Sequence, residues 1–308
     1  MRLLPALLLL LLSACAAPPT GRLPLLIDAD TANEIDDLYA IARALHEPRF
    51  DLRGLTSAQF HTSPLASSSS STVAESQAMN VELLRRAGRS DLPHPVGSPV
   101  PLAAPDRPAA SPAADFIIAQ AHALPEAQRL HIAVLGPCTN VASAILQDPA
   151  IVPRLVVHYI GFWHDPLTNV YDKKEFNSGN DTLAVEVLLD TPGLDFRVMT
   201  ATTSQLLVFE RTRAEATLRD CGPTGQYLLD RWATYTRWWT QQDPAKRRWI
   251  MWDVAVIEAL AHPEWATLDT LPAPPENGGR PIGIYTAIDT AAMQADYWAY
   301  WEAHFGGS

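Results

Sequence analysis

Short apolar runs alternate with stretches of helical periodicity along most of this chain. Residues 23–27 are continuously apolar, which is typical of a strand buried on both faces of a sheet. Ile35, Leu38 and Ile41 follow at a spacing that predicts an amphipathic helix. Further strands are expected at 52–56, 131–135, 155–160, 195–199 and 282–288, and further helices at 73–87, 113–124, 139–147, 182–189, 212–220, 225–239, 254–260 and 291–305. Strands separated by helices predict a single α/β domain over residues 23–308, with a mostly parallel open sheet flanked by helices.

The first residues are typical of a secretion signal. Arg2 precedes an apolar run over residues 3–12, which is too short for a bilayer span of roughly 20 residues. The sequence Leu12-Ser13-Ala14-Cys15 resembles a bacterial lipobox, which implies cleavage before Cys15 and lipidation of its thiol. An ordinary cleavage site is the alternative, because Ala14-Cys15-Ala16 also fits A-x-A. We therefore expect a signal peptide over residues 1–14, a tether over 15–22, and a lipid-anchored protein of the bacterial cell envelope that faces the periplasm.

Composition limits the partners. The chain has 23 basic and 34 acidic residues, a net charge of −11, which argues against a nucleic-acid binder. Three cysteines are too few for a disulfide scaffold. Cys138 and Cys221 would remain in the mature chain, either paired or as small buried apolar side chains. The serine-rich stretch 63–71 is expected to be a flexible or lid-like loop.

Four carboxylates gather where the first strand gives way to the first helix. Ligands of parallel sheets bind at the carboxyl ends of the strands, and Asp28, Asp30, Asp36 and Asp37 fall at such an end. Helix capping accounts for one or two acids at a helix start, but not for four. Like charges this close favour a cation, and carboxylate oxygens suit Ca²⁺ or Mg²⁺. The stretch therefore predicts a metal or catalytic site.

Known nucleotide and phosphate motifs fit this stretch poorly. The chain has no G-x-G-x-x-G after the first strand and no G-x-x-x-x-G-K-[ST]. Asp28-Ala29-Asp30 fits the opening of the haloacid dehalogenase phosphatases, D-x-D-x-T, but Ala32 stands where that pattern has Thr. A Mg²⁺-dependent phosphatase is kept as a less favoured alternative.

Four motifs in order resemble the inosine/uridine-preferring nucleoside hydrolases. Asp28-Ala29-Asp30 and Asp36-Asp37 resemble that family's D-T-D-P-G-x-D-D, with two extra residues between and a variant N-E-I-D-D ending. Leu135-Gly136-Pro137-Cys138-Thr139-Asn140 is similar to its G-P-L-T-N turn, and Glu175-Phe176-Asn177 matches its E-F-N, with Asn169 six residues earlier. Trp252-Asp253 followed by Val254-Ala255-Val256 resembles its H-D-P-x-A-V. The resemblance implies a Rossmann-like open sheet.

The same resemblance implies the roles of the site residues. Asp30, Asp37, the carboxylate of Asp253 and the backbone carbonyl of Thr139 would bind Ca²⁺. Asp36, Asn169, Glu175 and Asn177 would hold the ribose hydroxyls. Asp30 would also act as general base on a calcium-bound water, which agrees with the need for an activated water in glycoside cleavage. Asp28 would support these groups through hydrogen bonds.

The departures from the family concern the leaving group. Trp252 stands where many members have a histidine that can protonate the departing base. His61 and His164 are the candidates to replace it, and the alternative for each is a loop histidine without a catalytic role. Trp252 itself is a candidate to stack on the base. The neighbouring aromatic residues predict either core packing or further stacking, namely Trp232, Tyr235, Trp238, Trp239 and Trp249.

The sequence therefore predicts a calcium-dependent enzyme that hydrolyses the N-glycosidic bond of ribonucleosides or related N-ribosides to base and ribose. The alternative from another class is a non-catalytic riboside-binding lipoprotein on the same fold. The expected partner is a small-molecule riboside, with membrane contact through the lipid anchor only. The resemblance further implies a possible homo-oligomer.

Overall fold

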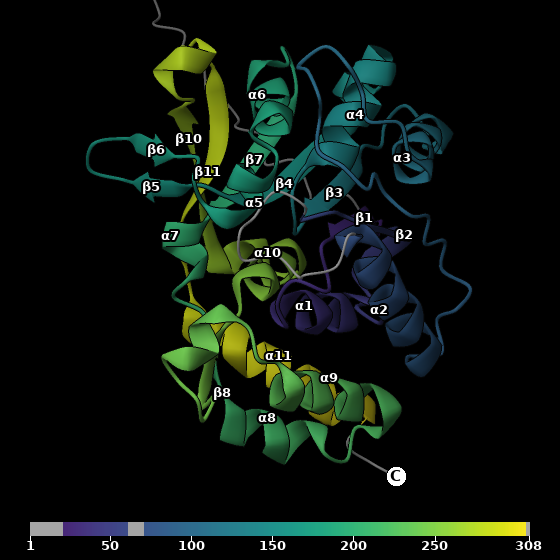
Figure 1. Cartoon of the computed structure of the whole chain (residues 1–308), viewed down its shortest axis with the longest axis vertical. Helices are drawn as coiled ribbons and strands as arrows, with labels where there is room; N and C mark the ends of the chain where they lie inside the picture. Colours follow the sequence, from purple (N-terminus) through teal and green to yellow (C-terminus); the bar gives the residue numbers. More distant parts are fainter. Residues whose placement is uncertain (1–20, 61–70, 306–308) are drawn as a thin grey trace, which may run out of the picture.

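Residues 21–60 and 71–305 are described by the structure, a computed structural model, and Figure 1 shows their arrangement. The predicted signal peptide with Cys15, and also His61 and most of the stretch 63–71, lie outside these residues. None of the helices in the described part is both long and apolar enough to cross a membrane.

A central sheet organises the described chain. Its seven strands lie in the order β10-β11-β7-β4-β3-β1-β2. Neighbouring strands are parallel, except that β10 runs antiparallel to β11. The strands are β1 (Leu23–Ala29), β2 (Phe50–Ser57), β3 (Leu130–Val134), β4 (Leu155–Gly161), β7 (Asp195–Thr200), β10 (Ala266–Pro272) and β11 (Pro281–Ile288). The predicted mostly parallel sheet is confirmed.

Two layers of helices cover the sheet because its strands are apolar on both faces. Leu25 and Ile27 of β1 belong to one apolar cluster, whereas Leu26 between them belongs to the other. Successive side chains of a strand point to opposite faces, so a continuous apolar run needs cover on both sides. One cluster takes in α1 (Asp36–Ala44), α2 (Thr72–Arg86), α8 (Arg211–Leu218), α9 (Gly222–Thr234), α10 (Trp252–Ala261) and α11 (Thr290–Phe305). The other takes in α3 (Pro112–Ala123), α4 (Thr139–Gln147) and α6 (Thr182–Asp190), and Figure 1 shows the two groups apart.

Several short elements at the carboxyl edge of the sheet are not predicted from the sequence. These are the hairpin β5 (Trp163–Asp165) and β6 (Val170–Asp172), the pair β8 (Val208–Glu210) and β9 (Arg248–Ile250), and the helices α5 (Phe176–Asn180) and α7 (Ala201–Ser204). Each is too brief to show a period. The edge strand β10 was also not predicted, because most of its residues are exposed and it lacks an apolar alternation.

The predicted helix over 225–239 is shorter than expected. α9 ends at Thr234, and Tyr235 is extended. The rings of Trp232 and Tyr235 both pack edge-on against Trp249, with centroids 5.7 and 5.0 Å away, and all three are buried. These aromatic residues therefore form core, which decides between the two sequence interpretations; the side chains of Trp238 and Trp239 lie outside the described part.

The two described cysteines are buried free thiols. Cys138 packs in the cluster of α3, α4 and α6, and Cys221 in the opposite cluster. They serve as small apolar side chains rather than as a disulfide.

Candidate active site

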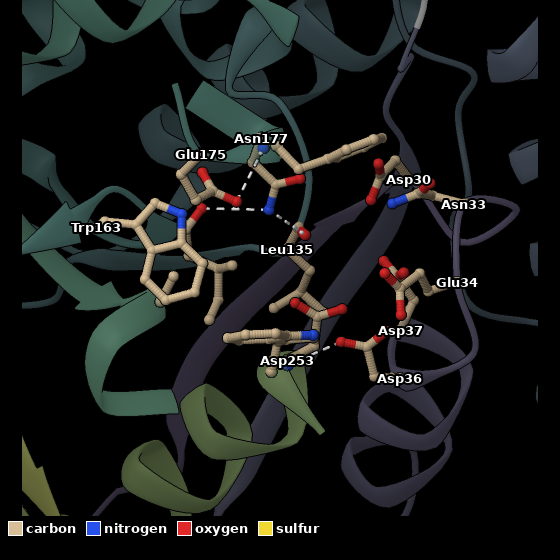
Figure 2. A pocket seen from close by; sticks show the side chains of 14 residues that line it. Asp30, Asn33, Glu34, Asp36, Asp37, Leu135, Trp163, Glu175, Asn177 and Asp253 are labelled. Carbon is tan, nitrogen blue, oxygen red and sulfur yellow. Dashed lines mark hydrogen bonds between the residues drawn. The ribbon is translucent and has the colours of Figure 1, made fainter. Parts of the chain in front are cut away.

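A pocket opens at the carboxyl ends of β1, β3 and β4. Its cavity volume is about 130 Å³, and it is open to solvent on one side. Its lining is shown in Figure 2 and consists of Asp30, Asn33, Glu34, Asp36, Asp37, Leu135, Ile160, Trp163, Glu175, Phe176, Asn177, Ala201, Trp252 and Asp253.

Two helices bring the acids of this pocket together. α1 begins with Asp36 and Asp37, and α10, which packs beside it, carries Asp253 in its first turn. Carboxylate oxygens of these three residues lie within 4.8 Å of one another. The Asp253 amide also donates to Asp36 Oδ2 at 3.3 Å. The positive ends of both helix dipoles favour negative charge at this point.

Burial makes this group of acids costly without a cation. Asp30, Asp36, Asp37 and Asp253 are each at most 3% exposed. Burial, and then repulsion from Asp37, raise the pKa of Asp36 to about 8. Burial, and then repulsion from Glu34, raise the pKa of Asp37 to about 7. Burial also raises the pKa of Asp30 and Asp253 well above the ordinary range, with repulsion from the neighbouring aspartates adding to it.

Unpartnered oxygens mark where a cation fits. Oδ2 of Asp30 and Oδ1 of Asp37 are buried and accept no hydrogen bond within the described chain. An unsatisfied buried carboxylate oxygen is unfavourable, and a hard cation with oxygen ligands relieves it. The donor set therefore fits a cation such as Ca²⁺. The carboxylates that lie close enough to share one ion are those of Asp36, Asp37 and Asp253, so Asp37 and Asp253 of the predicted metal set fall in this group, whereas Asp30 lines the same pocket beside it.

Asp28 supports the site from beneath. Its Oδ1 accepts hydrogen bonds from Thr56 Oγ1 at 2.6 Å and from Asn140 Nδ2 at 2.9 Å. Asn140 also donates to the Ser57 carbonyl and accepts from the Ser98 amide. Burial raises the pKa of Asp28 to about 6. This network joins β1, β2 and α4 next to the segment that carries Asp30, Asp36 and Asp37.

Gly136 gives Asp30 its space. A Cβ at Gly136 would lie 2.8 Å from Cβ, Cγ and Oδ1 of Asp30. We expect Gly136→Ala to displace the Asp30 carboxylate and to lower calcium affinity roughly 10- to 100-fold, as loss of support for a metal ligand does. Calorimetric titration with calcium measures this effect. Gly179→Ala is the matched control, because a Cβ there meets no atom closer than 3.6 Å; equal calcium affinity in both variants would contradict the prediction.

The predicted E-F-N motif begins α5 and braces the sheet edge. Glu175 accepts hydrogen bonds from the amides of Asn177 and Ser178, both at 3.0 Å. Asn177 Nδ2 donates to the carbonyls of Leu135 at 3.0 Å and Ile160 at 3.3 Å. Burial raises the pKa of Glu175. The motif therefore ties the ends of β3 and β4 while presenting its side chains to the pocket.

An aromatic corner faces the acids. Trp163 and Trp252 meet edge to face, with centroids 5.9 Å apart and planes at 87°. Trp163 remains 39% exposed, and Figure 2 shows it across the pocket from Asp30, Glu34 and Asp37. Trp252 is a candidate from the sequence, whereas Trp163 is not. The position of Trp163 just after a predicted strand, where ligands bind, was the available signal.

The structure places two predicted residues outside this pocket. Thr139 is the first residue of α4, so helical geometry directs its carbonyl along the helix; its Oγ1 donates to Asp181 Oδ2 at 2.6 Å. Leu135, at the end of β3, lines the pocket instead. Asn169 lies on the β5–β6 hairpin with φ of 52°, and its Nδ2 donates to the Pro272 carbonyl at 3.2 Å. Neither residue is among those that line the pocket, and the roles expected of them from the sequence stay predictions.

The candidate histidines do not line the described pocket. The His164 ring stacks on Tyr171, with centroids 4.6 Å apart, and its Nε2 is 3.0 Å from Asn169 Oδ1. His61 lies outside the described residues. Trp252 lines the pocket at the position where the resemblance expects histidine.

Comparison with known proteins identifies the family of the chain. Residues 25–298 match the model of the inosine-uridine preferring nucleoside hydrolase family. A probable uridine nucleosidase 1 of Oryza sativa subsp. japonica is 26% identical over 270 residues, 79% of this chain and 78% of that protein. Among solved structures, the plant nucleoside hydrolase PpNRh1 superposes with a TM-score of 0.71 at 18% identity, covering 93% of this chain and 100% of that one. A purine-preferring ribonucleoside hydrolase from Gardnerella vaginalis superposes with a TM-score of 0.67 at 19% identity, covering 91% of this chain and 98% of that one. Because this family model covers most of the chain, the chain belongs to the inosine-uridine preferring nucleoside hydrolase family, whose members are hydrolases of N-glycosyl bonds.

Proposed function

We propose that this protein hydrolyses N-ribosides to base and ribose with the help of a calcium ion. The observation that carries the proposal is the pair of unpartnered buried oxygens on Asp30 and Asp37, in a pocket that two indole rings also line. Asp30, Asp37, Asp253 and the Leu135 carbonyl would hold the ion. A bound calcium ion supplies positive charge that makes water easier to deprotonate.

The other side chains of the pocket would have separate roles in proton transfer and in binding the ribose and the base. Asp30 would accept the proton of the attacking water as the oxygen approaches the ribose C1′. Asp36, Glu175 and Asn177 would hold the ribose hydroxyls. Trp163 and Trp252 would pack on the base and exclude water from it.

Free ribose is the direct test of this proposal. The calcium-loaded chain from residue 16 onward is incubated with a panel of ribonucleosides, and released ribose is assayed. Release that is abolished by a chelator and by Asp30→Asn supports the proposed hydrolase. Nucleoside binding without release supports the riboside-binding alternative, whereas phosphate release with Mg²⁺ from phosphorylated substrates supports the phosphatase.

Calcium affinity is expected to fall as the pH is lowered from about 8 to about 5. The raised pKa values of Asp36, about 8, and Asp37, about 7, mean that the free site holds protons below these values. Calcium must displace those protons, so its apparent affinity falls by up to about tenfold per proton and pH unit. Calorimetry in two buffers of different ionisation enthalpy counts the protons released. Calcium binding without proton release at pH about 6 would contradict the prediction.

Replacing Asn177 with alanine is expected to weaken riboside binding about tenfold, because a ribose hydroxyl loses its partner. Asn177 also donates hydrogen bonds to two backbone carbonyls. Its loss should therefore lower the free energy of unfolding by roughly 1 kcal/mol and the melting temperature by a few degrees. The Michaelis constant and a thermal melt measure the two effects separately. Unchanged riboside affinity would remove Asn177 from the substrate site.

The location of the protein is also a proposal. The lipobox-like sequence that ends at Cys15 supports a lipid-anchored protein facing the periplasm.

A further inference from the structure

The charge of the pocket indicates which ribosides it can favour. Its described lining carries six carboxyl groups and no lysine, arginine or histidine. The carboxyl groups are those of Asp30, Glu34, Asp36, Asp37, Glu175 and Asp253, each at most 9% exposed. A divalent cation held by these acids would offset part of their charge, and Arg231 acts on Asp37 from outside the lining, but the groups that face a ligand in the described lining are acids and not bases.

Two arginines donate to backbone carbonyls of residues 32–34, between Asp30 and Asp36. Arg231 donates to the carbonyls of Ala32 and Glu34, and Arg237 donates to the carbonyl of Asn33. Neither side chain lines the pocket. A ligand in this pocket therefore meets acids without a facing guanidinium.

The aromatic corner accepts a flat ring and favours a positive one. An indole face attracts a cation that lies within about 6 Å of its centre. Trp163 keeps 39% of its surface exposed at the pocket, and Trp252 forms the adjoining wall at 87° to it. Figure 2 shows Trp163 opposite the acids, so a ring stacked on it lies in their field.

The corner provides poor proton donors for a departing base. A neutral nucleoside leaves with the electron pair of the broken C1′–N bond on its ring nitrogen, and it needs a proton there. An indole N–H is not acidic, and His164 is stacked on Tyr171 outside the described pocket. A base that is already positively charged needs no proton, because the same electron pair neutralises the ring as it leaves.

We propose that this pocket prefers ribosides of positively charged heteroaromatic bases, such as N-linked pyridinium rings or N7-alkylated purines. The inference rests on the proposed riboside hydrolysis and specifies its substrate. The C1′–N bond breaks, and its electrons cancel the positive charge of the ring. The water oxygen bonds to C1′, and its proton passes to Asp30 and then to solvent. The products are a neutral base, ribose and one proton.

The test compares 7-methylguanosine with guanosine, which differ by one methyl group and one positive charge, and adds nicotinamide riboside and uridine. Each enzymatic rate is divided by the uncatalysed rate of the same riboside, so that intrinsic lability is removed. We expect this normalised kcat/KM to be at least about tenfold higher for the two cationic ribosides, through cation–π attraction and the acidic lining. Equal or higher normalised values for guanosine and uridine would overturn the inference while leaving riboside hydrolysis intact. No ribose from any of the four substrates would overturn the proposed function itself.

Two variants separate charge recognition from general binding. Trp163→Leu is expected to raise the Michaelis constant for the methylated, cationic guanosine about 3- to 10-fold more than the constant for guanosine itself, because only the cation loses a cation–π partner. Trp252→His introduces a proton donor and removes an indole, so it should raise kcat for guanosine and lower kcat/KM for the methylated substrate. Parallel losses for both substrates in both variants would contradict the inference.

Discussion

Replacing Asp37 with alanine is expected to abolish calcium binding and ribose release together. Its carboxylate is 2% exposed, and Oδ1 has no hydrogen-bond partner within the described chain, so it is available to a cation. Loss of one carboxylate from a small set of oxygen ligands removes both charge and geometry. We expect kcat/KM to fall by at least about 1,000-fold, since the activated water and the ribose position depend on the same ion.

Calcium titration and the ribose assay measure the two losses in the same preparation. Asp106→Ala is the matched control, because it removes an exposed aspartate far along the chain from the pocket residues and should leave both quantities unchanged. Thermal unfolding with excess calcium adds a further readout: a ligand that binds only the folded state stabilises it, so calcium should raise the melting temperature of the parent protein and not of Asp37→Ala. Intact calcium affinity in Asp37→Ala would reject the metal assignment.

The central part of the fold was predictable because burial leaves a strong pattern. β1, β3 and β4 are apolar on successive positions, and their helices carry apolar stripes, so the sequence predicted a parallel sheet with two covers. β10 was missed because an exposed edge strand needs no apolar alternation. The end of α9 was misplaced because a tertiary contact, the packing of Tyr235 on Trp249, overrides a helical aromatic spacing.

The acidic side of the site was predictable for a different reason. Asp30, Asp36 and Asp37 are close in sequence, and the motif containing Asp253 indicated a fourth acid, so their meeting required only the fold. The backbone contribution to the pocket was not predictable at the level of one residue. Whether Leu135 or Thr139 lines the pocket depends on where β3 ends and α4 begins, and α4 already includes Thr139.

The position of Asn169 shows the limit of spacing arguments. Its separation from Glu175 agrees with the family pattern, yet its left-handed backbone places it on the β5–β6 hairpin against Pro272. Trp163 enters the pocket from the same hairpin. Loop conformation, which leaves no period in the sequence, therefore decides which of these two residues is among those that line the pocket.

Replacing Arg43 with alanine is expected to cost about 3–5 kcal/mol of unfolding free energy, the range for breaking a buried ion pair. Its guanidinium is 1% exposed and donates to Glu47 at 2.5 Å, Glu258 at 2.9 Å and Asp296 at 2.6 Å. These contacts join α1 to α10 and α11, and α1 and α10 carry Asp37 and Asp253 at their other ends. Without Arg43, the buried side chain of Glu258 keeps its desolvation cost and loses its counter-charge, whereas Glu47 keeps its pair with Arg49 at 2.9 Å.

The same variant should respond to pH in a defined direction. Burial raises the pKa of Glu258 to about 8, although Arg43 opposes this, and without Arg43 the folded chain holds that proton to still higher pH. The unfolded chain releases it near the ordinary value of about 4.5. Between these values the unfolded state binds fewer protons, so stability falls as pH rises, and the loss caused by Arg43→Ala should be larger at pH about 8 than at pH about 5. Urea unfolding at the two pH values measures this difference in the free energy of unfolding.

Arg85→Ala is the control. It breaks an exposed ion pair with Glu82 and should lower the free energy of unfolding by less than about 1 kcal/mol at either pH. If both arginine variants cost the same, the buried cluster does not stabilise the helix pair that carries the acids of the pocket.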